Sequence, residues 1–116
     1  MKNDAIIMTM LFDYYGELLT EKQKNCFDLY YNQDFSLGEI ATDEGITRQG
    51  VHDSILRAEN ALLEYEEKLC CVQRDVALTE ATKQIEAIAT RLEKRLDPEL
   101  KRLAAEIKAA LEQMKE

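Results

Sequence analysis

Residues 36–62 of the chain read SLGEIATDEGITRQGVHDSILRAENAL, and the signals in this stretch decide the fold. Ser36 and Glu39 have the spacing of a capping box, which begins a short helix. Gly45 can take the left-handed conformation that ends this helix, and Thr47 can cap the helix that follows. Two short capped helices joined by a tight turn predict a helix-turn-helix motif.

The second helix of the motif has one apolar side and one polar side. Val51 and Ile55 lie one turn apart and are predicted to face the core. Their phase turns the polar side chains outward, where these side chains can meet a protein or nucleic-acid partner. The candidate binding residues are Arg48, Gln49, His52, Asp53 and Arg57.

Two more helices are predicted before the motif. Apolar residues recur at helical spacing near the start of the chain, so residues 4–15 read as an amphipathic helix that ends at Gly16. Thr20 and Gln23 form a second capping box, which begins a helix that reaches about Tyr31. The residues predicted to form the apolar faces of these two helices are Ile6, Ile7, Met10, Leu11, Tyr14, Leu18, Cys26, Phe27 and Tyr30.

A long apolar seam begins within the motif and runs beyond it. Its residues follow one another in alternating steps of four and three, which is the heptad pattern of a long helix packed against another helix. The facing helix can belong to the chain's own C-terminal segment or to a second copy, and we expect a homodimer. The predicted dimer contacts are Val51, Ile55, Leu62, Tyr65, Leu69 and Val72, with Ala58 and Val76 in the same register.

The C-terminal segment, residues 79–116, carries two apolar stripes separated by Asp97 and Pro98. Asp97 suits an N-cap and Pro98 the first helical position, so two helices joined by a short turn are predicted. A single helix kinked at Pro98 is the alternative. The predicted fold is therefore all-α, with a helix-turn-helix core over residues 1–58 and a long helix with a C-terminal helical hairpin over residues 59–116.

The charge balance limits the choice of partner. The chain of 116 residues has a formal net charge of −8, and residues 20–58 hold four basic against seven acidic side chains. Lysine and arginine supply most of the non-specific affinity for DNA, so this balance disfavours DNA and anionic membrane surfaces as partners. The N-terminus has no recognisable export signal or membrane-spanning segment, and we expect a cytoplasmic protein.

Few residues suit catalysis or metal binding. The cysteines, Cys26, Cys70 and Cys71, form no Cys-x-x-Cys pair, and His52 is the single histidine. We therefore expect neither a metal nor another cofactor. The sequence also has no glycine-rich phosphate loop and no nucleophile motif, which predicts a binding protein and not an enzyme.

The motif resembles known proteins. Residues 36–62 are similar to region four of bacterial sigma factors, the region that reads promoters. The longer stretch LLTEKQKNCFDLYYNQDFSLGEIATDEGITRQGVHDSILRAENALLEYEEKL, residues 18–69, resembles the YlxM family of small helix-turn-helix proteins. That resemblance implies a regulatory or accessory protein of the protein-targeting pathway, with the signal recognition particle GTPase, its RNA, or both as partners.

Three roles for the motif stay open. The acidic charge favours a scaffold that contacts a protein or an RNA–protein partner. The sigma-like pattern favours sequence-specific DNA binding by a dimer, in which Arg48 would bind guanine and Gln49 would bind adenine. The third role is purely structural.

Overall fold

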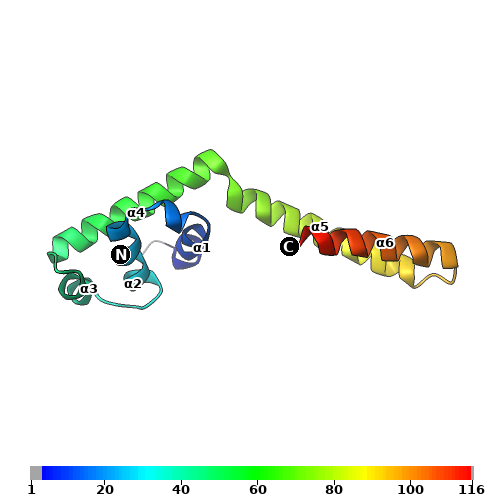
Figure 1. Ribbon diagram of the computed structural model, residues 1–116, viewed down its shortest axis with the longest axis horizontal. Helices are drawn as coiled ribbons and strands as arrows, with labels where there is room; N and C mark the ends of the chain where they lie inside the picture. Colours follow the sequence, from blue (N-terminus) through cyan, green and yellow to red (C-terminus); the bar gives the residue numbers. More distant parts are fainter. Residues whose placement is uncertain (1–3, 116) are drawn as a thin grey trace. The chain divides into compact units, whose positions relative to one another are not determined.

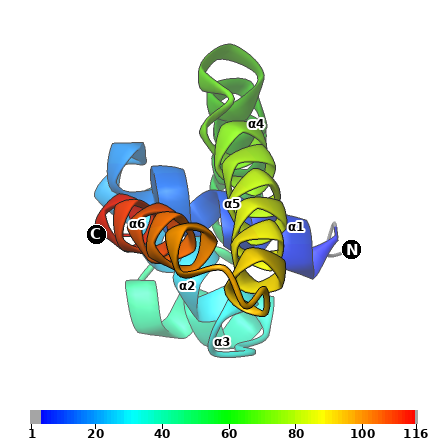
Figure 2. The same cartoon turned by 90° about the vertical axis from the view of Figure 1, so that its right-hand side faces the viewer.

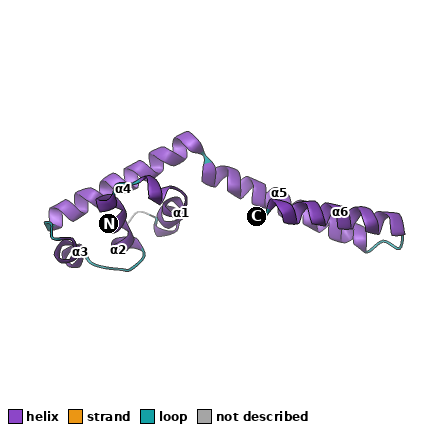
Figure 3. Cartoon of the chain, in the orientation of Figure 1, coloured by secondary structure: helices purple, strands orange, loops and turns teal. Residues whose placement is uncertain are grey.

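A computed structural model describes residues 4–115, and every regular element in this range is helical (Figures 1 and 3). The predicted all-α class is therefore confirmed. None of the helices in this range is long and apolar enough to cross a membrane. The elements are α1 (Ala5–Tyr15), a 3-10 turn (Gly16–Leu18), α2 (Glu21–Tyr31), α3 (Leu37–Glu44), α4 (Arg48–Leu69), α5 (Cys71–Glu93) and α6 (Pro98–Met114).

The chain divides into two compact units, and the first ends at Val72. The boundary lies beyond the predicted one at residue 58. The reason is that α4 continues the N-terminal core past that point: Leu62 is fully buried, and Tyr65 and Val72 pack against the same cluster. We call the first the N-terminal unit and the second, from Gln73 onwards, the C-terminal hairpin.

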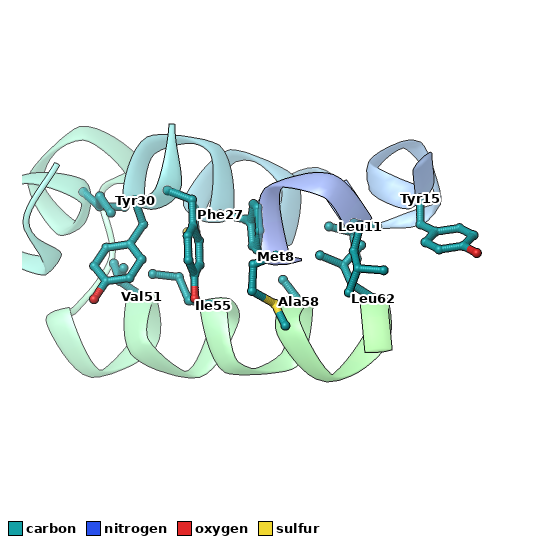
Figure 4. Packing of buried hydrophobic residues seen from close by; sticks show 13 residues of the cluster. Met8, Leu11, Tyr15, Phe27, Tyr30, Val51, Ile55, Ala58 and Leu62 are labelled. Atoms are coloured by element: carbon teal, nitrogen blue, oxygen red, sulfur yellow. The ribbon is translucent and has the colours of Figure 1, made fainter. Parts of the chain in front are cut away.

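Helix α4 is the central helix of the N-terminal unit, and α1, α2 and α3 each contact it. Figure 4 shows side chains from α1 and α2 converging on one side of α4. Phe27 lies at the centre, with its ring stacked on Phe12 at 4.7 Å and on Tyr31 at 4.4 Å between centroids. Four apolar residues of α4 in this core are no more than 2% exposed: Val51, Ile55, Ala58 and Leu62.

This packing corrects the predicted dimer seam. The seam residues Val51, Ile55 and Leu62 contact the chain's own first three helices, so they offer no surface to a second copy. A heptad pattern requires only that some helix faces it. Helices α1, α2 and α3 take that place for these three residues, and not the C-terminal segment or a second copy. Leu69, at the end of the seam in α4, is 42% exposed.

The predicted apolar face of α1 is also wrong in part. The buried residues are Met8, Leu11 and Tyr15, whereas Ile6 is 75% exposed and Tyr14 43% exposed. The residues between Ala5 and Phe12 are almost all apolar, so their spacing fits more than one helical phase. Packing against α4 selects the phase that buries Tyr15.

The predicted continuous helix through Val76 breaks at Cys70, which has a left-handed φ of 54°. The break is held by side chains of α1 and α4. The Tyr15 hydroxyl donates to Glu66 Oε1 at 2.6 Å and accepts from the Cys71 amide at 3.0 Å. Glu66 Oε1 also accepts from the Val72 amide at 3.1 Å. These bonds satisfy the first amides of α5, which have no partner within their own helix. Burial raises the pKa of the Tyr15 phenol, and the hydrogen bond to Glu66 raises it further.

In the C-terminal hairpin, α5 and α6 run antiparallel and are joined by a short turn (Figures 1 and 2). The predicted hairpin is confirmed, and the single kinked helix is wrong. Asp97 caps α6 by accepting from the Glu99 amide at 2.9 Å, and Pro98 takes the first helical position. Ion pairs join the two helices between Lys108 and Glu93 at 2.9 Å and between Lys115 and Glu86 at 2.7 Å.

Candidate binding surface of the helix-turn-helix

The helix-turn-helix forms from α3, the turn after it and α4. The Ser36 hydroxyl accepts from the Glu39 amide at 3.1 Å, and Glu39 Oε1 accepts from the Ser36 amide at 3.0 Å. The bond from the Ser36 amide stabilises the carboxylate and lowers the pKa of Glu39. Gly45 ends α3 with a φ of 66°, a conformation that costs glycine little. The predicted capping box and turn are both confirmed.

The start of α4 is fixed by Thr47, whose Oγ1 accepts from the Gly50 amide at 3.0 Å. A Cβ at position 50 would lie 3.1 Å from that same oxygen, so glycine leaves room for the cap. The cap fixes where the first turn of α4 begins. Arg48 and Gln49 occupy that turn, and both side chains are exposed.

A shallow hollow lies at the junction of α3 and α4. It is lined by Leu37 of α3 and by Arg48, Gln49 and His52 of α4. Three of the predicted binding residues are therefore brought together. Leu37 was missed as a neighbour of this surface, because only the crossing of α3 and α4 places it there and no sequence spacing reports that crossing.

Asp53 belongs to the same surface and is bonded to one of its members, Gln49. The Gln49 side-chain amide donates to Asp53 Oδ1 at 3.0 Å, and His52 Nδ1 lies 3.6 Å from the same oxygen. Residues four apart on a helix are neighbours, so the spacing of Gln49 and Asp53 could have predicted this bond. The bond holds Gln49 along the helix, and the carboxylate places a negative charge beside the hollow.

The two arginines of the surface differ in position. Arg48 lines the hollow, whereas Arg57 lies one turn beyond Asp53 and is exposed outside it. Within residues 4–115, neither arginine makes an ion pair with a carboxylate. Helix α3 carries acidic residues and no lysine or arginine. We use "α3–α4 surface" for the group Leu37, Arg48, Gln49, His52 and Asp53.

This geometry defines a small, all-helical protein built on a helix-turn-helix, with an exposed and partly acidic surface at the start of its second motif helix. The family UPF0122, described as "Putative helix-turn-helix protein, YlxM / p13 like", matches residues 2–103. The chain belongs to this family. The resemblance noted from residues 18–69 is therefore confirmed and extends over most of the chain.

Relatives in several bacteria agree with this membership. A UPF0122 protein of Thermoanaerobacter sp. (strain X514) is 41% identical over 115 residues, which cover 98% of each chain. The UPF0122 protein lmo1802 of Listeria monocytogenes is 42% identical over 108 residues, 93% of this chain and 91% of that one. A UPF0122 protein of Desulforamulus reducens is 55% identical over 67 residues, 58% of this chain and 57% of the relative.

Proposed function

We propose that the chain is a non-catalytic regulatory protein that binds a protein partner through its α3–α4 surface. By the resemblance to the YlxM family, the partner is the signal recognition particle GTPase, alone or together with the particle's RNA. Binding would then take place in the cytoplasm, where this GTPase works. The proposal concerns the recognition surface and leaves the C-terminal hairpin aside.

One observation supports a protein partner over DNA most directly. The Gln49 amide, which a DNA reader of this type would present to a base, is instead bonded to Asp53 at 3.0 Å. To reach a base, Gln49 would have to break this bond and leave Asp53 close to the phosphates. Arg48 remains available to pair with a carboxylate of a protein, and Leu37 and His52 add apolar contact area beside it.

The test is to map the surface by substitution. The GTPase, with and without its RNA, is titrated into labelled full-length protein at physiological salt. Arg48→Ala is expected to weaken binding at least about tenfold, which corresponds to about 1.4 kcal/mol. The control is Lys101→Ala, which removes an exposed positive charge from α6. Equal affinity of wild type and Arg48→Ala would rule out this surface, and no binding by the wild type would rule out this partner.

A second candidate function is DNA binding, since Arg48 and Gln49 occupy the first turn of a correctly formed second motif helix. Asp53→Asn distinguishes the two candidates. It removes the negative charge and weakens the hold on Gln49. A DNA reader held back by Asp53 should gain affinity for duplex DNA, whereas a protein-docking surface should lose affinity for the GTPase or leave it unchanged.

A further inference from the structure

The two long sides of the C-terminal hairpin are chemically different. One side is closed by the ion pairs Lys108–Glu93 and Lys115–Glu86. The other side is apolar and open to solvent. Its large residues are Leu78 at 49%, Ile85 at 43%, Ile88 at 53%, Leu103 at 39% and Met114 at 54% exposure. We call these five residues the apolar face.

Helical geometry places these residues on a common face. In α5 the exposed Ile88 directly precedes the buried Ala89, and in α6 the exposed Leu103 directly precedes the buried Ala104. One residue turns an α-helix by about 100°. The two helices α5 and α6 are antiparallel (Figure 1). The same angular offset from their contact line therefore brings both stripes to the same side of the hairpin.

The contact between α5 and α6 encloses few large apolar side chains completely. Within the described part of this unit, only Ala89, Ala104 and Leu111 are buried apolar residues, and two of these are alanines. Helices in proteins owe most of their stability to packing of an apolar face. A contiguous apolar face that stays open to solvent is typical of a surface that binds another protein.

We propose that a second copy of the chain covers the apolar face, so that two C-terminal hairpins form a four-helix bundle. This inference stands independently of the proposed function. In the bundle, α5 of one copy packs against α6 of the other, with the two turns at the same end. A two-fold axis parallel to the helices produces this arrangement and makes the interface self-complementary.

The charges beside the apolar face fit this arrangement. Arg91 of α5 and Arg95, just after the end of α5, line a hollow with Ile88 and Leu92. In the bundle, a side chain of the second copy would fill this hollow. On α6, Glu99 and Glu106 flank Leu103. Arg102 pairs with both of these carboxylates and leaves that edge with a net negative charge. Packing α5 against the second copy's α6 brings the basic edge next to the acidic edge on both sides of the bundle.

The test is the mass of the full chain by sedimentation equilibrium at tens of micromolar. The wild type is expected at twice the chain mass of 13.4 kDa. Ile88→Glu places a charge in the apolar face and is expected to weaken the dimer at least about 100-fold. The matched control is Ala87→Glu, which adds the same charge to an exposed position on the opposite side of α5.

Both variants change exposed residues, and circular dichroism checks that their helix content is retained. A second pair of variants tests the charges: Glu106→Arg should weaken the dimer, and adding Arg91→Glu in the same chain should restore it. A wild-type monomer would overturn the inference. So would a dimer that survives Ile88→Glu, or one that Ala87→Glu disrupts equally.

Discussion

The N-terminal unit and the C-terminal hairpin bury their apolar residues very differently. In the N-terminal unit, three helices surround α4 and enclose Phe27, Ile55 and Leu62 almost completely. In the described part of the C-terminal hairpin, two alanines and Leu111 are buried, and Ile85 and Ile88 remain near half exposed. The number of packed helices accounts for the difference. Three helices around α4 cover its apolar residues, whereas α5 and α6 cover each other on one side only and leave another side open.

The two proposals rest on this difference. The N-terminal unit encloses a continuous core, and the α3–α4 surface, the proposed binding surface, lies outside that core. The C-terminal hairpin has an incomplete core, and its open face is its distinguishing feature. The following predictions test this comparison, beginning with the largest effect.

Adjacent leucines of α4 give the most direct test of the N-terminal core. Leu62 is fully buried, whereas Leu63 is 45% exposed. Leu62→Ala is expected to reduce the free energy of unfolding by about 2–5 kcal/mol, because it removes buried methyl groups and leaves a cavity. Leu63→Ala should change it by no more than about 0.5–1 kcal/mol. Urea denaturation measures both, and similar values for the two variants would contradict the proposed core.

Adjacent alanines of α6 test the helix contact in the C-terminal hairpin. Ala104 is fully buried against α5, and Ala105 is exposed. Ala104→Leu is expected to force the helices apart and destabilise the hairpin by about 1–3 kcal/mol. Ala105→Leu should be close to neutral. Amide hydrogen exchange in α5 and α6 reports the change, and protection unaffected by Ala104→Leu would show that the helices do not meet there.

A buried polar pair distinguishes the N-terminal unit further. The Tyr31 hydroxyl donates to Glu59, and both side chains are less than 10% exposed. Tyr31→Phe removes the donor to a buried carboxylate and should cost about 1–2 kcal/mol. Tyr65→Phe is the control, since its hydroxyl makes only a long bond of 3.4 Å to the Leu18 carbonyl. If Tyr65→Phe proved the more damaging of the two in thermal unfolding, the assignment of this pair would be wrong.

The smallest predicted effect concerns the break between α4 and α5. Burial and the bond to Glu66 raise the pKa of Tyr15 in the folded protein. Folding therefore favours the neutral phenol. Its contribution to the free energy of unfolding is fully present below the ordinary tyrosine pKa of about 10, and it is lost as the pH rises from there through the raised pKa. In a phenolate absorbance titration, Tyr15→Phe should remove a tyrosine that ionises above the ordinary tyrosine pKa. Loss of an early-titrating tyrosine instead would contradict the bonds at the break.

Local signals in the sequence predicted the parts of the fold that depend on neighbours along the chain. The capping boxes at Thr20 and Ser36 and the left-handed Gly45 are formed by residues within a single turn, so their spacing is sufficient. The break at Cys70 depends on Tyr15 of α1, far away in sequence, and a left-handed cysteine has no sequence signature. The burial phase of α1 likewise depends on tertiary packing.

The candidate binding surface was likewise predicted where it depends on one helix and missed where it depends on the packing of two. The phase set by Val51 and Ile55 correctly directs Arg48 and Gln49 outward, because one helix carries all four residues. The addition of Leu37 depends on the crossing of α3 and α4, which spacing does not encode. The heptad seam indicated correctly that α4 packs against helices but not which helices, since the pattern is the same for the chain's own helices and for a second copy.

The central claim is that the α3–α4 surface binds a protein and does not read DNA. The most direct test compares two titrations over a range of salt concentrations, one with the signal recognition particle GTPase and one with duplex DNA from upstream of the gene that encodes the chain. We predict binding to the GTPase that changes little with salt, and only weak binding to DNA. Sequence-specific DNA binding that falls steeply with salt, by a log–log slope of about −0.9 per phosphate contacted, together with no affinity for the GTPase, would contradict the claim.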